Sequence, residues 1–118
     1  MIRIAVDAMG GDYAPSAVVD GAVAAARYLA VPVALVGPTA PLEQALSTYP
    51  RWRQFGIEII EAPDVVSMSD SPAAAVRRMP GASIRVAAEL VVRQGAGALV
   101  SAGNTGATVI WPRMARLA

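Results

Sequence analysis

The chain has 118 residues, of which 55% are apolar and 16% charged, and its formal net charge is +1. This composition supports one folded domain with a hydrophobic core and argues against intrinsic disorder. A near-neutral charge does not favour nucleic-acid binding. The sequence contains no Cys, His or Lys, which excludes disulfides, thiolate nucleophiles, the commonest metal ligands, Schiff-base chemistry and a Walker A loop. Any chemistry must therefore use carboxylates, Arg, hydroxyls, one Asn and backbone amides.

Two apolar segments raise the question of a membrane or secretory signal. The longest uncharged segment, residues 94–112, contains Gly, Asn, Ser and Thr, so it is not the apolar stretch of about 20 residues that a spanning helix needs. The N-terminal apolar run stops at Asp7, which is too short for a signal peptide. We therefore expect a cytoplasmic protein.

Short β-branched runs alternate along the chain with Ala-rich segments of helical periodicity. The pattern predicts strands over residues 2–6, 31–36, 57–60 and 98–100. It predicts helices over residues 15–30, 41–49 and 83–95, and a short one that begins at residues 71–72 and ends before residue 80. This order is typical of βαβ units, and strands that are apolar on both faces are typical of a parallel sheet covered by helices.

We therefore predict an α/β protein with a three-layer α/β/α architecture around a parallel sheet of about four strands. Residues 1–118 form one unit without an internal boundary, and the sheet is incomplete because Pro112 breaks the segment after the fourth strand. In the first helix, the predicted buried stripe includes Val19, Val23, Ala26 and Ala30, with Leu29 beside it. In the last helix, Ser83 is the predicted N-cap, and the predicted buried face comprises Ile84, Ala87, Ala88 and Val91.

The first candidate functional loop, residues 7–12 (DAMGGD), directly follows the first predicted strand. In parallel α/β sheets, ligands bind beyond the carboxyl ends of the strands. Gly10 and Gly11 allow the backbone to turn sharply and approach a ligand, while Asp7 and Asp12 can orient hydroxyls, water or an Arg. A tight turn in which Asp12 caps the next helix is the commoner use of such residues.

The second candidate loop, residues 101–106 (SAGNTG), follows the fourth predicted strand at a predicted helix start. Its hydroxyls, the amide of Asn104 and the N–H groups around its glycines can form an anion-binding nest. An ordinary strand-to-helix turn is the alternative. Because both loops lie at the same end of the predicted sheet, they can face one site.

Two Arg-containing segments are weaker candidates. Arg77, followed by Arg78, can clamp a phosphate or carboxylate with two hydrogen bonds, although such a pair is more often a solvated helix face. Residues 51–53 (RWR) can dock an acidic partner, but a surface loop is the favoured interpretation. No G-x-G-x-x-G dinucleotide fingerprint occurs at any Gly of the sequence.

Taken together, the two loops resemble the bacterial phosphate acyltransferases of phospholipid synthesis. Residues 70–72 (DSP), Arg77 and residues 83–87 (SIRVA) are also similar to that family, so the resemblance extends to about Ala107. It implies an α/β enzyme, usually a homodimer, that forms acyl phosphate from inorganic phosphate and an acyl group carried on acyl carrier protein. It implies no cofactor and no metal, and it makes this chain the N-terminal third of such an enzyme, inactive when isolated. It also implies that other regions of the enzyme can associate with the membrane surface.

Phosphate is already an anionic nucleophile near neutral pH, so the reaction needs positioning and oxyanion stabilisation rather than a His base. We expect Asn104, Ser101 and Asp7 to serve catalysis. We expect the phosphate to be bound by Gly10, Gly11, Asp12, Gly103, Thr105, Gly106 and Arg77. The sequence departs from the family pattern at Met79 and Pro80, at Ala82 and after Ala107. A non-catalytic phosphate- or nucleotide-binding module and a relative of phosphotransacetylases are the alternatives.

Overall fold

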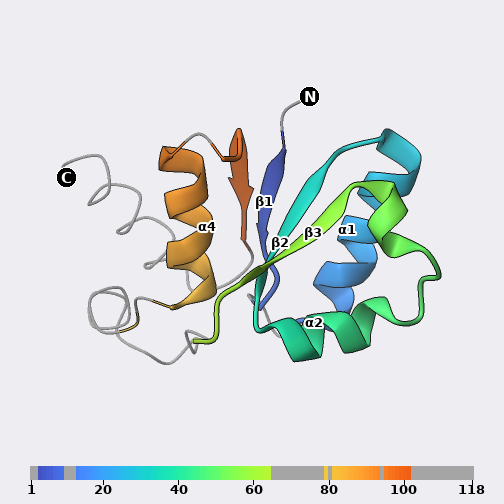
Figure 1. Cartoon of the computed structure of the whole chain (residues 1–118), viewed down its shortest axis with the longest axis horizontal. Coiled ribbons are helices and arrows are strands. Elements are labelled where there is room, and N and C mark those ends of the chain that lie inside the picture. The colour runs from blue at the N-terminus through green and yellow to red at the C-terminus, as the bar shows by residue number, and fades with distance from the viewer. Residues whose placement is uncertain (1–2, 10–12, 65–78, 80, 94, 102–118) are drawn as a thin grey trace.

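The computed structural model describes residues 3–9, 13–64, 79, 81–93 and 95–101. Within them, one parallel sheet has the strand order β3-β2-β1-β4 (Figure 1). Its strands are β1 (Ile4–Asp7), β2 (Val33–Gly37), β3 (Ile57–Glu61) and β4 (Ala98–Val100). The helices are α1 (Ser16–Leu29), α2 (Thr39–Leu46) and α4 (Ser83–Val92), with a 3-10 turn η1 (Trp52–Phe55) before β3. The helix predicted to begin at residues 71–72 lies outside the described residues.

Helices cover both faces of the sheet, which confirms the predicted three-layer α/β/α architecture (Figure 1). On one face, α1 and α2 bury side chains such as Val23 and Leu42 against Leu35 of β2. On the other face, α4 packs Ala87 against a second cluster that includes Ala5 and Val36. Because successive strand side chains point to opposite faces, the strands have to be apolar on both sides, as the sequence indicated.

The same alternation decides where the end of β1 points. Val6 and Ala8 belong to the cluster under α1 and α2, whereas Ala5 belongs to the cluster under α4. Asp7 is two residues after Ala5, so its side chain lies on the α4 face. The small side chains Ala5 and Ala87, both fully buried, let α4 approach the sheet closely.

The strand order reverses next to β1. The chain moves outward from β1 through β2 to β3, then returns to place β4 on the other side of β1. In an open parallel sheet, this reversal leaves a crevice beyond the carboxyl ends of the two central strands, and ligands bind there. The crevice predicted by this topology lies between the ends of β1 and β4.

Some details of the helices differ from the sequence prediction. Leu29 is 72% exposed and Ala30 is also exposed, because α1 ends at Leu29 and its C-cap, Ala30, adopts a left-handed conformation (φ 53°). The predicted stripe therefore stops at Ala26. In α4, Val91 is only half-buried, whereas Ile84, Ala87 and Ala88 are buried as predicted.

Among the described residues the sheet ends at β4, in agreement with the prediction of an incomplete sheet. Val100 is 56% exposed, and an apolar groove of ≈ 310 Å³ runs between α1, β1 and β4. Within the described residues, no helix combines the length and the hydropathy needed to cross a bilayer.

A hydrogen bond between Tyr49 and Asp20 ties the end of the α2 region to α1. This bond raises the pKa of Tyr49 above its ordinary value, because the neighbouring carboxylate favours the protonated phenol. The bond therefore contributes to stability at neutral pH, and the contribution is lost as the pH rises through the raised pKa. In an ultraviolet titration, we expect Asp20→Asn to lower the pKa of Tyr49, and this effect of Asp20→Asn to disappear in the Tyr49→Phe background. Tyr13→Phe is the control background, because Tyr13 is 80% exposed; an effect of Asp20→Asn that survives Tyr49→Phe would contradict the assignment.

Candidate functional site

A buried carboxylate lies at the end of β1 and joins three parts of the chain. Asp7 is only 4% exposed. Its Oδ2 accepts a hydrogen bond from the Ser101 hydroxyl at 2.8 Å, and its Oδ1 accepts one from the Ser83 hydroxyl. The backbone N–H of Met9 also donates to Oδ1, at 3.2 Å. The end of β1, the start of α4 and the end of β4 therefore converge on one carboxylate.

The register of the sheet explains the position of Ser101. Val6 pairs with Val100 in the parallel β1–β4 ladder, so the next residues along the two strands, Asp7 and Ser101, lie side by side. Side chains at equivalent positions of neighbouring strands point to the same face. The Ser101 hydroxyl is therefore within reach of the Asp7 carboxylate.

The segment after β3 fixes the start of α4. The Ser83 backbone N–H donates to the carbonyl of Asp64 at 3.1 Å, and the Asp64 N–H donates to the carbonyl of Gly81 at 3.0 Å. A Cβ atom on Gly81 would lie 2.9 Å from Oδ2 of Asp64 and 3.1 Å from two ring carbons of Pro63, so this close approach favours glycine. Ser83 is consequently held under the sheet, where it is 3% exposed.

The predicted N-cap role of Ser83 is wrong. The N-cap of α4 is Ala82, which makes no side-chain cap hydrogen bond, and Ser83 is the first helical residue. The Ser83 hydroxyl donates to Asp7 instead. The carboxylate of Asp7 thereby lies at the amino end of α4, where a negative charge is stabilised by the helix dipole.

This arrangement orients groups rather than offering the carboxylate to a ligand. Both oxygens of Asp7 accept hydrogen bonds, and a buried negative charge repels an anion. The Ser101 hydroxyl donates its proton to Asp7. Asp7 thus fixes the orientation of Ser101 and the distance between the ends of β1 and β4.

The structure brings together two of the predicted site residues, Asp7 and Ser101, and adds Ser83. Asp7 is the first residue of the loop 7–12, and Ser101 is the first residue of the loop 101–106. Both candidate loops therefore start at the hydrogen bond between these two residues. The other predicted site residues lie outside the described part of the chain: Gly10, Gly11, Asp12, Arg77, Gly103, Asn104, Thr105 and Gly106. Their roles stay predictions.

The sequence analysis assigned Ser83 a capping role and did not predict it as a site residue. A Ser at the start of an amphipathic helix is usually explained by capping. The available signal was the position of Ser83 at the helix start that faces the carboxyl ends of the strands. Its partner is 76 residues away in the sequence, so the contact could be found only once the sheet was built.

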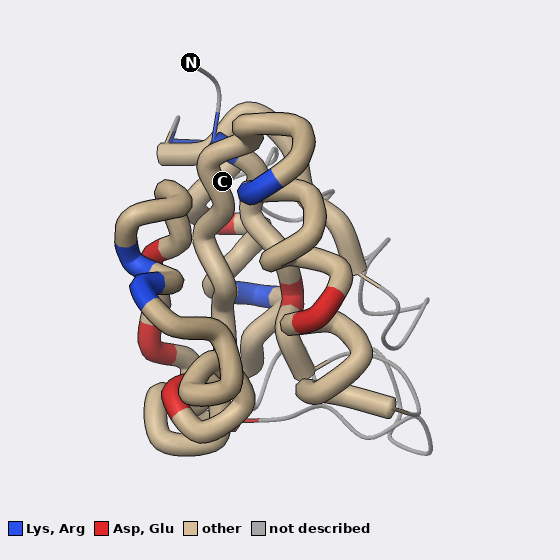
Figure 2. The backbone as a smooth tube through the Cα atoms, turned by 90° about the vertical axis from the view of Figure 1, so that its right-hand side faces the viewer, with Lys and Arg blue, Asp and Glu red and all other residues tan. Residues whose placement is uncertain are grey.

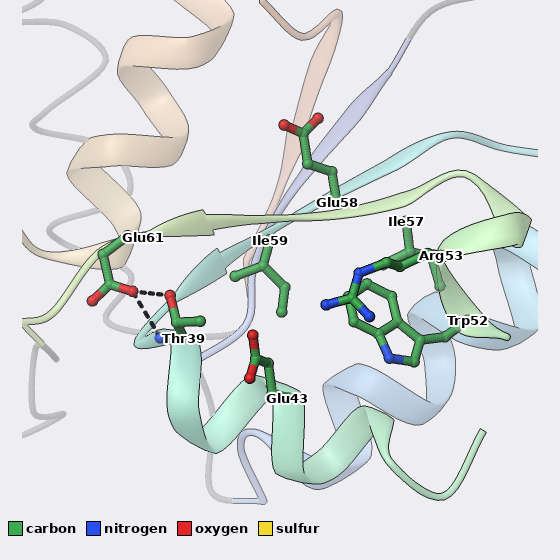
Figure 3. A pocket seen from close by; sticks show the side chains of 8 residues that line it. All are labelled: Thr39, Glu43, Trp52, Arg53, Ile57, Glu58, Ile59 and Glu61. Atoms are coloured by element: carbon green, nitrogen blue, oxygen red, sulfur yellow. Dashed lines mark hydrogen bonds between the residues drawn. The ribbon is translucent and has the colours of Figure 1, made fainter. Parts of the chain in front are cut away.

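The remaining charged residues of the described part of the chain form no competing site at the strand ends. Acidic and basic segments of that part are both present on the side shown in Figure 2. Among the described residues, no group of three or more carboxylates is arranged to hold a metal ion. A pocket of ≈ 420 Å³ lies at the β3 edge and contains none of the predicted site residues (Figure 3).

Removing the Ser83 hydroxyl tests how much its bond to Asp7 contributes. Ser83→Ala leaves the volume nearly unchanged but deprives a buried carboxylate of one donor. We expect the free energy of unfolding to fall by about 1.5 kcal/mol, which is typical of a hydrogen bond to a charged group. Urea denaturation measures it. Ser47→Ala is the control, because Ser47 is exposed and its hydroxyl bonds only a local carbonyl; equal losses in both variants would contradict a special role for Ser83.

Comparisons with known proteins agree with this description. A family model described as "Fatty acid synthesis protein" matches residues 2–117. Phosphate acyltransferase from Synechococcus sp. (strain JA-3-3Ab) is 52% identical over 108 residues, which cover 92% of this chain and 29% of the relative. Phosphate acyltransferase from Geotalea uraniireducens (strain Rf4) is 50% identical over 108 residues, 92% of this chain and 31% of the relative.

A third relative, phosphate acyltransferase from Gloeothece citriformis (strain PCC 7424), is 46% identical over 107 residues, 91% of this chain and 30% of the relative. The chain thus spans less than a third of the length of these relatives. Matches of this extent agree with the resemblance carried by the two loops. The chain belongs to the fatty acid synthesis protein family.

Proposed function

We propose that this chain supplies the phosphate-holding part of an enzyme that transfers a fatty acyl group from acyl carrier protein to inorganic phosphate. The acyl phosphate formed would serve phospholipid synthesis. The observation that carries the proposal is the hydrogen bond between Asp7 and Ser101, at 2.8 Å, because these two residues start the two Gly-containing loops. The similarity to phosphate acyltransferases supports the reaction class.

In this reaction, a phosphate oxygen attacks the thioester carbonyl carbon and a C–O bond forms. The carbonyl becomes an oxyanion, the C–S bond then breaks, and the leaving thiolate takes up a proton. Backbone N–H groups of the loop after Ser101, together with Asn104, would hold the phosphate or the oxyanion. Asp7 and Ser83 would position the start of that loop without touching substrate.

The full reaction needs regions beyond this chain, since the relatives are about three times as long. We therefore expect the isolated chain to be inactive. The complete enzyme would be a homodimer that works in the cytoplasm, next to the inner face of the membrane, with acyl carrier protein and phosphate as its partners and without a cofactor.

A chimera tests the proposal. In the Synechococcus relative, the matching 108 residues are replaced by the corresponding residues of this chain. We expect the chimera to release thiol from acyl-acyl carrier protein only when phosphate is present, and to form acyl phosphate. Asn104→Ala in the chimera should reduce turnover severely while the protein remains folded.

The outcomes separate the proposal from its alternative. A folded chimera that binds phosphate without cleaving the thioester would favour a phosphate-binding module and contradict the proposal. A chimera that requires coenzyme A in place of acyl carrier protein would favour a phosphotransacetylase-like activity. An unchanged rate in Asn104→Ala would contradict the role of that residue alone.

A further inference from the structure

The outer edge of β3 presents backbone groups that β2 does not use. In a parallel sheet, the N–H and C=O groups of alternate residues point to opposite sides of a strand. The Gly56 carbonyl accepts from Val33 and the Ala62 N–H donates to Gly37, both at 2.9 Å. The even-numbered residues of this segment therefore face β2, and Ile57, Ile59 and Glu61 present their N–H and C=O groups away from the sheet.

A pocket of ≈ 420 Å³ runs along this edge, between β3, α2 and η1 (Figure 3). At its η1 end, the guanidinium of Arg53 lies 4.2 Å from the centre of the Trp52 ring. At its other end, Oε2 of Glu61 accepts hydrogen bonds from the backbone N–H of Thr39, at 2.9 Å, and from its hydroxyl. Within the described residues, Oε1 of Glu61 has no hydrogen-bond partner. The edge thus carries a cation at one end and a carboxylate at the other.

A second copy of the chain in antiparallel orientation matches this edge. With Ile59 opposite Ile59 of the second copy, Ile57 lies opposite Glu61 and Glu58 lies opposite Ile60. The residues whose backbone groups face outward then form the hydrogen-bonded pairs of an antiparallel ladder. The carboxylate of Glu61 in each copy reaches the end where the other copy carries Arg53, and no two like charges lie directly opposite each other.

We propose that β3 pairs with β3 of a second copy, which joins two sheets into one continuous sheet across a two-fold axis. The self-complementary placement of Arg53 and Glu61 favours this occupant. An extended basic peptide would satisfy the carboxylates but would leave Arg53 opposite a like charge. The pairing lies at the edge of the sheet farthest from β4, so it leaves the ends of β1 and β4 open. It adds an interface to the homodimer that belongs to the proposed function, and its test does not depend on acyl transfer.

Amide hydrogen exchange tests the pairing directly. We expect the full chain to dimerise in analytical ultracentrifugation, and exchange at Ile57, Ile59 and Glu61 to slow by at least about tenfold from dilute to concentrated samples. The amides of Glu58 and Ile60 are the internal control, because β2 protects them at every concentration. A chain that stays monomeric, or a dimer whose outward amides are not protected, would overturn the proposal.

Two variants and one control complete the test. Ile59→Pro removes an outward N–H without removing a bond to β2, and Arg53→Glu places a carboxylate opposite Glu61 of the second copy. We expect both to weaken dimerisation at least about tenfold. Arg93→Glu makes the same charge change on the exposed end of α4 and should leave dimerisation unchanged. If Ile59→Pro does not fold, Arg53→Glu alone tests the pairing. A dimer that persists in Arg53→Glu would refute the pairing. Protection of the amides of Ile57, Ile59 and Glu61 by a basic peptide on a monomeric chain would refute it as well.

Discussion

Replacing Asp7 with alanine is expected to lower the free energy of unfolding by about 3 kcal/mol, because three hydrogen-bond donors lose their acceptor. The donors are the hydroxyls of Ser83 and Ser101 and the N–H of Met9. Asp7 itself is 4% exposed, so water does not fully replace the carboxylate. The loss is a large fraction of the about 5–15 kcal/mol that stabilises a typical domain. Urea denaturation followed by circular dichroism measures it.

The conservative variant separates the acceptor role from the charge. Asp7→Asn keeps one carbonyl oxygen, and its amide group can donate to a serine hydroxyl that rotates. We therefore expect a smaller loss, about 1–2 kcal/mol, from the missing charge at the amino end of α4. Glu43→Ala is the control, because Glu43 is an exposed carboxylate on α2, and it should leave the unfolding midpoint nearly unchanged. A loss in Asp7→Ala no greater than in Glu43→Ala would show that the three contacts do not stabilise the fold.

The architecture could be predicted from the sequence because each strand carries its own signal. Residues 98–100 form β4 as predicted, and α4 begins at Ser83, one residue earlier than the predicted N-cap role of that serine implied, since β-branched runs and helical periodicity are local patterns. The ends of the elements were less certain. Leu29 continues the helical period of α1 but is exposed, because the helix ends at this residue. Periodicity reports which face of a helix is apolar, but it does not report where the underlying sheet ends.

The site could be predicted only in part, because its contacts depend on tertiary structure. Asp7 and Ser101 were placed at one end of the sheet by a general rule for parallel strands. Their direct contact depends on the register of β1 with β4, and the sequence contains no signal for that register. The role of Ser83 depends on how closely α4 approaches the sheet, which is set by small residues at the interface.

The interface between α4 and the sheet is therefore expected to control the site. Ala87 is fully buried against Ala5 and Val36, so Ala87→Leu adds three carbon atoms where no space exists. We expect the free energy of unfolding to fall by about 2–3 kcal/mol, because α4 must move away from the sheet. Ala24→Leu on the exposed side of α1 is the control and should be nearly neutral.

A double-mutant cycle then connects this packing to the hydrogen bond. In the original chain, Ser83→Ala removes a donor to Asp7. In the Ala87→Leu background, the outward shift of α4 has already broken that bond, so adding Ser83→Ala should cost less than about 0.5 kcal/mol. Full additivity of the two changes would show that the spacing of α4 does not determine the Ser83–Asp7 contact. Non-additivity would show that the small residues between α4 and β1 place the serine at the carboxylate, and thereby fix the point from which both loops start.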